Sequence, residues 1–120
     1  MARRKNRWVL DRDTYLLEEG DGRLDDYRKY KKRHGFSPDE TWNLDTVLAE
    51  FIIPRLKAFR KMTIGYPAGL TSRKWSIILG KMQRAFEMYL DCDVGTDEET
   101  MRKINEGLDL FRKYFMSLWW

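Results

Sequence analysis

A chain of 120 residues, 42% of them hydrophobic, can form one compact domain but is too short for two. It contains 23 Lys and Arg against 19 Asp and Glu, a net charge of +4. All of that excess lies before the first acid, Asp11, in four residues: Arg3, Arg4, Lys5 and Arg7. The remaining 23 − 4 = 19 bases balance the 19 acids. We therefore predict a basic N-terminal arm, residues 1–22, that is either a solvated tail or a contact for nucleic acid.

Several classes of protein are excluded by what the sequence lacks. Arg or Lys interrupts every apolar run before the ~18 residues that a membrane span needs. The basic start is not followed by the apolar segment of a secretory signal. The single cysteine, Cys92, cannot form an internal disulfide and suits a reducing compartment. We expect a soluble protein that stays in the cytoplasm where it is made.

The first predicted helix is short and basic. Residues 24–33 place two acids, Asp25 and Asp26, ahead of five bases, the order that the helix dipole favours, and Gly35 is a suitable C-cap. Ser37, followed by Pro38 and Glu40, then forms a capping-box signal for a new helix start.

The central stretch, residues 41–62, has the longest apolar stripe of the chain. Asn43 is a candidate N-cap, and Pro54 predicts a kink or a break because it cannot donate to the carbonyl of Glu50. The stripe, which we expect to be buried, comprises Leu44, Val47, Leu48, Phe51, Ile52, Leu56 and Phe59.

Two further amphipathic helices follow. The first begins at Thr71 or Ser72, after a rigid loop that carries Gly65, Tyr66 and Pro67. Its stripe comprises Trp75, Ile78, Leu79, Met82, Ala85, Phe86 and Tyr89, with Gly80 on another side as a point of close helix approach. The second starts at Thr96 and runs to the C-terminus, with a stripe of Met101, Ile104, Leu108, Phe111, Phe115 and Leu118.

These elements predict an all-α fold without strands. Three long helices joined by short loops, with the shorter basic helix, pack most economically as a single-domain antiparallel bundle over residues 23–120.

No residue constellation predicts catalysis or a cofactor. His34 and Cys92 are single and far apart, so we expect no zinc site. Asp91, Asp93 and Asp97 lack the glycine and glutamate of a calcium loop and are better interpreted as a solvated acidic loop. A nucleophile beside a base and a glycine-rich phosphate loop are also missing, and we predict a protein that is not an enzyme.

Basic and aromatic residues supply the candidate ligand site. Arg28 to Arg33 are interleaved with Tyr27 and Tyr30, and a second basic group lies late in the central helix. Cations with aromatic faces can bind a nucleotide or nucleic acid, whereas the alternative is two solvated helix faces. The predicted ligand-facing set is Trp42, Arg55, Lys57, Arg60 and Tyr66.

The last two residues, Trp119 and Trp120, predict an interface. Each large apolar side chain left in water forgoes about 1.5–3 kcal/mol, so the two indoles pack either on the protein's own core, against Trp75 or Phe51, or on a partner or second subunit. Trp8 poses the same alternative more weakly.

The order of several rare residues resembles a group of small bacteriophage proteins. The motifs are Gly35-Phe36-Ser37, residues 41–45 (TWNLD), residues 53–57 (IPRLK), Gly65-Tyr66-Pro67, Trp75 with Ile78-Leu79 and Lys81-Met82, Gly107-Leu108, Tyr114-Phe115 and Leu118-Trp119-Trp120. In this order they are similar to small tailed-bacteriophage proteins without an assigned activity, over roughly residues 35–120. The resemblance implies a protein made in the cytoplasm of an infected bacterium, and it supplies no catalytic residue.

Three functions are consistent with these features. By analogy with other small phage proteins, the first is inhibition of host defence, either by occluding an effector or by sequestering a nucleotide signal. The second is an assembly or structural protein that forms a homo-oligomer or binds another phage protein through Trp119 and Trp120. The third is general nucleic-acid binding through the N-terminal arm.

Overall fold

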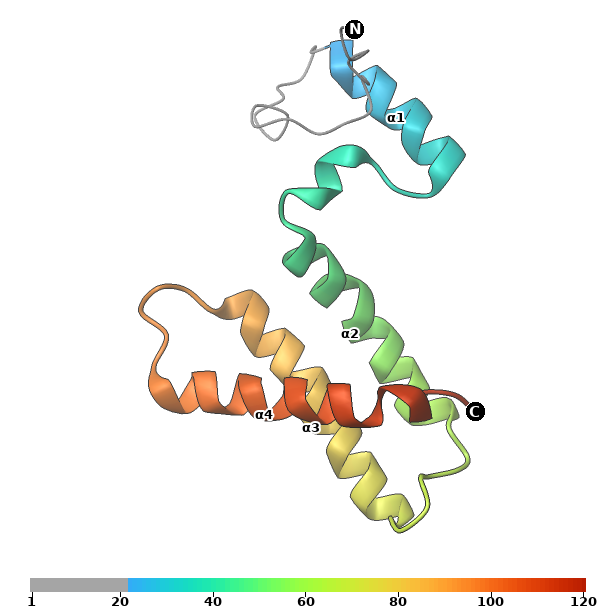
Figure 1. The fold of residues 1–120 in the computed structure, drawn as a ribbon, viewed down its shortest axis with the longest axis vertical. Coiled ribbons are helices and arrows are strands. Elements are labelled where there is room, and N and C mark those ends of the chain that lie inside the picture. The colour runs from blue at the N-terminus through green and yellow to red at the C-terminus, as the bar shows by residue number, and fades with distance from the viewer. Residues whose placement is uncertain (1–21) are drawn as a thin grey trace, which may run out of the picture. The chain divides into compact units, whose positions relative to one another are not determined.

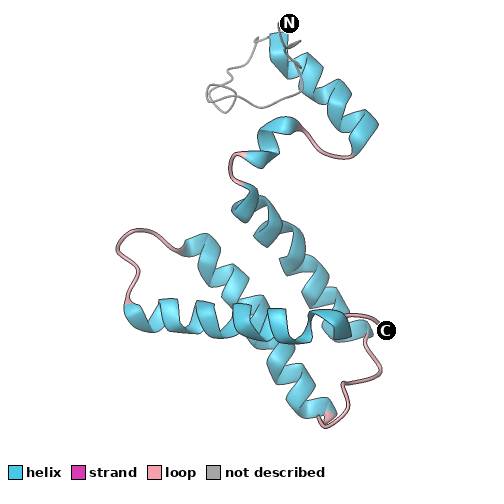
Figure 2. Cartoon of the chain, viewed as in Figure 1, coloured by secondary structure: helices cyan, strands magenta, loops and turns pink. Residues whose placement is uncertain are grey.

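A computed structural model describes residues 22–120, and every regular element in this range is helical (Figures 1 and 2). The all-helical prediction is therefore confirmed for these residues. The predictions for Arg3, Arg4, Lys5, Arg7 and Trp8 fall outside the described residues. The chain divides into two compact units, one ending at Val47 and the other comprising Leu48–Trp120.

The first unit contains the basic helix α1, Gly22–His34, and a 3-10 turn η2, Pro38–Thr41. Gly35 ends α1 with a φ of +87°, and its N–H donates to the Lys31 carbonyl at 2.8 Å, which is the predicted left-handed C-cap. The Ser37 N–H donates to the Glu40 carboxylate, one of the two bonds of a capping box. The predicted capping box at Ser37 therefore starts a single 3-10 turn and not a long helix, since η2 ends at Thr41 before α2 begins.

Helix α2, Leu44–Met62, begins in the first unit and continues through Pro54. A break at the proline is therefore wrong, although Pro54 removes one backbone hydrogen bond. Next to the proline, the Arg55 guanidinium donates to the carbonyl of Phe51, one turn earlier in the helix, at 2.9 Å. Two residues after the proline, Leu56 is buried in the core and holds the second half of the helix against its neighbours.

The expectation that the whole α2 stripe is buried is wrong. Leu56 is fully buried, and Ile52 and Phe59 pack partly buried against the core. Leu48 and Phe51 keep about half of their side chains exposed. The core cluster of the second unit includes residues of α2 from Ile52 onward, and in the preceding turn the small Ala49 is buried while the larger side chains stay exposed.

Helix α3, Ser72–Asp91, is built as its sequence predicts. Thr71 caps it by accepting the Lys74 N–H at 3.1 Å, and Trp75, Leu79 and Met82 are buried. Together with Leu56 of α2 these three residues form the core of the second unit.

Helix α4, Glu98–Tyr114, starts and ends differently from its prediction. Its N-cap is Asp97, which accepts the Thr100 N–H at 2.7 Å, whereas the Thr96 hydroxyl accepts the Asp93 N–H at 2.8 Å. The helix stops at Tyr114, and a 3-10 turn η3, Phe115–Ser117, leads into the last three residues.

The closest helix contact in the second unit joins α3 to α4, which cross in Figure 1. A Cβ placed on Gly107 would lie 2.3 Å from the Ala85 Cβ and 2.6 Å from the Lys81 carbonyl oxygen. The buried face of α4 therefore follows Ile104 and Gly107, and Leu108 of the predicted stripe is partly exposed.

Gly80, the predicted point of close approach, instead faces a side chain. Its bare surface is covered by the Arg60 guanidinium, whose Nη2 lies 3.2 Å from the position of a Cβ. Edge-to-face ring pairs complete the α3–α4 contact, with Trp75 and Tyr114 centroids 5.5 Å apart and Phe86 and Phe111 5.3 Å apart. An antiparallel bundle that includes all the helices stays a prediction.

Candidate binding site: an aromatic hollow

Two of the sequence-predicted regions meet around one hollow in the second unit. The loop 64–67, the buried Trp75 of α3 and the C-terminal residues Ser117, Trp119 and Trp120 line a cavity of about 300 Å³. We call this site the aromatic hollow. Its volume lies at the lower end of the range for small-molecule sites, and it suits one or two apolar side chains equally well.

Local structure positions each wall of the hollow. On the loop, the Thr63 hydroxyl donates to the Gly65 carbonyl at 3.2 Å, and the Leu70 N–H donates to the Pro67 carbonyl at 3.1 Å. Gly69, with a φ of +85°, adopts the left-handed conformation that closes this turn. Trp75 is held by the edge of Tyr114.

The C-terminal wall depends on a turn after α4. The Leu118 N–H donates to the Phe115 carbonyl at 3.3 Å, and the Leu118 side chain packs against the core. The two residues that follow, Trp119 and Trp120, are 75% and 64% exposed. Leu118 therefore anchors the end of the chain and leaves both indoles outside the core.

The hollow is lined by apolar surface that is largely open to solvent. Tyr66 is 54% exposed, and Ile64 is almost entirely exposed. The two indoles line the same cavity as the core residue Trp75, yet both remain largely exposed, so the two alternatives for them both stay predictions. An apolar patch of aromatic residues from separate segments is typical of an interaction surface.

Within the described residues no charged side chain lines the hollow, but the stretch of sequence that contains its loop and Trp75 carries charge of one sign. From Phe51 to Phe86 there is no acid, and eight bases occur: Arg55, Lys57, Arg60, Lys61, Arg73, Lys74, Lys81 and Arg84. The last turn of α4 adds two more bases, Arg112 and Lys113. Lys113 Nζ lies 5.3 Å from the Tyr114 ring centroid. A partner with acidic side chains around an apolar anchor would complement this surface.

The opposite charge is concentrated in the connection between α3 and α4. Between Ala85 and Met101 there is no base, and six acids occur: Glu87, Asp91, Asp93, Asp97, Glu98 and Glu99. We call residues 91–99 the acidic loop. Asp93 Oδ1 accepts the Gly95 N–H at 2.8 Å, and this turn leaves the Val94 side chain fully exposed.

Two acids of the loop are held in their charged form. Hydrogen bonds from the Thr100 side chain and backbone lower the pKa of Asp97. The Arg102 side chain, which donates to Glu99 at 2.7 Å, lowers the pKa of Glu99 in the same way. Both groups are therefore ionised at neutral pH.

The predicted basic set on α2 does not gather at one place. At 100° per residue, Arg55 and Lys57 are about 200° apart around the helix and point to nearly opposite sides. The Arg55 guanidinium lies 3.6 Å from the Phe51 ring centroid, and Arg60 Nη1 donates to Gln83 Oε1 at 3.0 Å. Two of the three cations thus stabilise the fold around α2.

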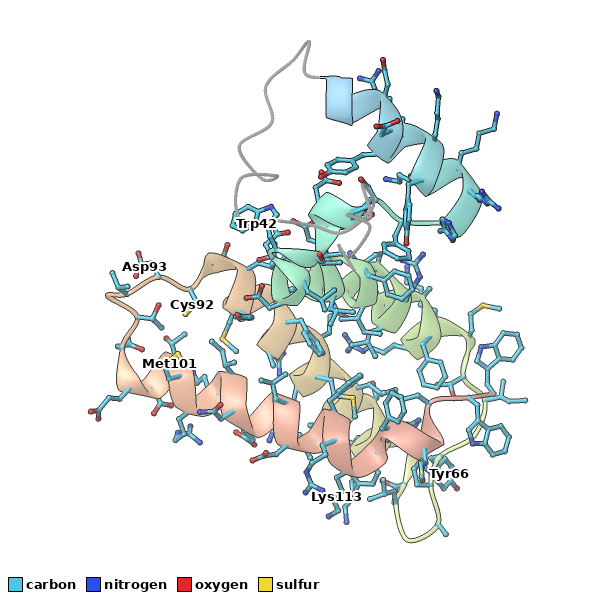
Figure 3. All side chains as sticks on the ribbon, turned by 45° about the horizontal axis from the view of Figure 1, so that its top comes forward. Trp42, Tyr66, Cys92, Asp93, Met101 and Lys113 are labelled. Carbon is cyan, nitrogen blue, oxygen red and sulfur yellow. The ribbon has the colours of Figure 1, made fainter. Side chains whose placement is uncertain are left out.

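The other predicted aromatic residues are distributed over both units. Trp42 is exposed and lies in the first unit, whereas Tyr66 lies on the loop after α2 in the second (Figure 3). On α1, the Tyr30 ring packs against His34 at 4.1 Å and against Phe36 at 5.4 Å between centroids. Tyr30 thus already packs against two other rings of the first unit.

Within residues 22–120, no group of three or more His, Cys, Asp or Glu side chains is arranged to hold a metal ion. None of the helices in this range combines the length and the apolar character that crossing a membrane requires.

Sequence reasoning identified Tyr66, Trp119 and Trp120 but not that they share a site. It named Trp75 as one residue on which the indoles could pack, but it did not place Ile64 or Pro67 in the site. The available sequence signals were the long acid-free segment and the two consecutive indoles after Leu118. Comparisons with models of protein families, with curated proteins and with solved structures gave no match for this chain.

Proposed function

We propose that this protein acts by binding rather than by catalysis, and that its aromatic hollow receives the acidic loop of a second copy of the same chain. The single observation that supports this most is the meeting of Tyr66, Trp119 and Trp120, three exposed aromatic residues from segments far apart in sequence, around one hollow. The protein would then be a self-assembling structural component, one of the functions expected from its sequence.

Charge and shape complement each other in this contact. The described side chains that line the hollow are uncharged, but its loop and Trp75 belong to residues 51–86, which include bases and no acids, and the acidic loop belongs to a stretch that includes acids and no bases. Val94, fully exposed between Asp93 and Gly95, supplies the apolar anchor that an aromatic hollow of about 300 Å³ can accept.

The acidic loop and the aromatic hollow lie at opposite ends of α4, so the loop of one molecule cannot enter the hollow of the same molecule. The acidic loop precedes α4 and the two indoles follow it, at opposite ends of that helix (Figures 1 and 3). Its 17 residues separate the two features by about 25 Å at 1.5 Å per residue. We propose that the loop-to-hollow contact is heterologous and repeats head to tail from one copy to the next, whereas a reciprocal exchange of loops between two copies would instead give a closed dimer.

The test is the oligomeric state measured by sedimentation velocity. The wild-type chain should associate with a Kd of about 10–100 µM, as suits one loop in one hollow, and should dissociate at high salt. Replacing Trp119 and Trp120 by Ala should abolish association, and so should Asp93→Asn combined with Val94→Ser, in which Asn keeps the Gly95 bond. Met116→Ala, which removes an exposed apolar residue outside the hollow, is the matched control.

Mixing the two double variants separates this proposal from its alternatives. Each keeps the half that the other lacks, so an equimolar mixture should form a heterodimer and nothing larger. A wild-type chain that is monomeric at about 500 µM, well above the expected Kd, would overturn the proposal. Normal association of the loop variant would also do so, because it would mean that the indoles pair with each other.

Inhibition of a host-defence effector has less support from the geometry, because the predicted cations on α2 do not converge. If the resemblance to small bacteriophage proteins holds, the assembly forms in the cytoplasm of an infected bacterium.

A further inference from the structure

A second cavity of the same unit lies between α3 and α4, away from the aromatic hollow. It has a volume of about 310 Å³ and is lined by Lys81, Arg84 and Met88 of α3 and by Arg102, Lys103 and Glu106 of α4. We call it the basic groove. It shares no lining residue with the aromatic hollow.

Helical spacing explains why these side chains face one another. Lys81, Arg84 and Met88 occur at i, i+3 and i+7 along α3, which places them on one side of that helix. Arg102 and Glu106 are four residues apart on α4, with Lys103 beside them. The two faces are adjacent because Gly107 packs directly on Ala85. Gly107 follows Glu106 in the sequence, and Ala85 follows Arg84.

This glycine contact fixes the width of the groove. No side chain can be placed on Gly107 without a clash with Ala85 and with the backbone of Lys81. Both walls are therefore carried by helices at their closest approach, and their charged side chains converge without a rearrangement of the backbone.

Acids already neutralise two of the four cations. Lys81 Nζ lies 2.8 Å from Glu106 Oε1, and Arg102 lies 3.6 Å from the other oxygen of the same carboxylate. Arg102 also pairs with Glu99 at 2.7 Å. The hydrogen bond from Lys81 lowers the pKa of Glu106, so this carboxylate is ionised at neutral pH and holds Lys81 and Arg102 in place.

The other two cations are available. In the part of the chain that the structure describes, neither Arg84 nor Lys103 has a carboxylate within ion-pair distance, although Lys103 contributes at longer range to the lowered pKa of Asp97 and Glu99. The lining residues alone carry four positive charges and one negative charge. An anion in the groove would bridge Arg84 and Lys103 and would meet no unpaired carboxylate.

We infer that the basic groove binds the phosphate of a phosphorylated small molecule. Arg84 can form two parallel hydrogen bonds to phosphate oxygens, and Lys103 adds a point charge from the opposite wall. The cavity has room for more than the phosphate, and the polarisable side chain of Met88 provides an apolar surface for an attached ring. The ligand class that fits is a mononucleotide.

The experiment uses ATP without magnesium as the probe and measures its affinity for the full chain by isothermal titration calorimetry. Replacing Arg84 and Lys103 together by Gln should weaken binding about tenfold or more, since both charge-assisted contacts are lost. Lys57→Gln with Arg73→Gln removes the same charge from exposed positions outside the groove and should change the affinity less than about twofold. Both double variants should keep the wild-type Tm.

Two results would overturn the inference. The first is an equal loss of ATP affinity in both double variants, because binding would then depend on net charge alone. The second is tight binding of a single-stranded oligonucleotide that neither variant weakens, together with no measurable binding of ATP to the wild-type chain. Each measurement is independent of self-association, because the W119A/W120A variant leaves the groove intact and should bind ATP as the wild type does.

Discussion

Helices α2 and α3 carry apolar stripes of the same period, yet they are buried to very different extents. On α3 the stripe meets α4 at the Gly107–Ala85 contact, and Leu79 is completely buried. On α2 the large side chains that reach the core begin at Ile52, Ala49 is buried as well, and Leu48 is 54% exposed. An apolar stripe predicts an amphipathic helix. Whether its apolar face is buried in the core depends on how closely a neighbouring helix backbone approaches it.

Truncating one leucine of each stripe is the most direct way to challenge this comparison. Leu79→Ala leaves a cavity in the core and should lower the free energy of unfolding by about 2–5 kcal/mol. Leu48→Ala removes a half-exposed side chain and should cost less than about 1 kcal/mol. Urea denaturation measures both, and equal losses would mean that the α2 stripe is buried in solution.

Two helical glycines sharpen the comparison further. Gly107→Ala forces a methyl group onto Ala85 and the Lys81 carbonyl and should destabilise the protein by about 1–3 kcal/mol, despite the better helix propensity of Ala. Gly80→Ala meets only the movable Arg60 guanidinium and should be neutral or slightly stabilising. If both substitutions stabilise the protein in thermal denaturation, the close contact between α3 and α4 is wrong.

The smallest expected effect concerns the ion pair that links α3 to α4. The pKa of Glu106 is lowered by Lys81 from its ordinary value of 4.5. The stabilisation is therefore complete above that value and is lost as the pH falls through the lowered pKa. Glu106→Gln should lower the Tm at pH 7 by about 1–3 °C, since the pair is half-exposed.

The same variant should also flatten the dependence of the Tm on pH between pH 5 and pH 3, as measured by circular dichroism. Glu50→Gln, an exposed carboxylate on α2, is the control. An unchanged pH profile in the Glu106 variant would show that the pair contributes nothing.

Local rules predicted the helices well because caps and periods are local. The Thr71 cap, the Gly35 turn and the α3 stripe follow from neighbouring residues alone. Ile104, Phe111 and Leu118 of the predicted α4 stripe reach the core, but the prediction passed over Gly107 because periodicity counts apolar side chains and glycine has none. Gly107 matters because the backbone of α3 lies against it, and rules based on neighbouring residues in the sequence cannot predict that contact.

The sequence singled out several residues of the candidate sites, but it did not predict which of them lie together in the fold. Trp119, Trp120 and Tyr66 were singled out as unusual, and only the turn at Leu118 brings them together. The cations of the basic groove come from two helices, and their meeting depends on how those helices pack. Arg60 was assigned to a ligand, but its bond to Gln83 is a tertiary contact that spacing along one helix cannot show.

The position of the acidic loop and the aromatic hollow at opposite ends of α4 gives the molecule a direction. In the head-to-tail assembly that we propose, a copy with an intact hollow and the D93N/V94S loop would accept a neighbour but would not bind the next copy. Such a copy would terminate every growing chain that it joins. A small fraction of it mixed with wild-type protein would therefore shorten the assemblies in proportion to its share, which makes the loop variant an inhibitor of its own parent.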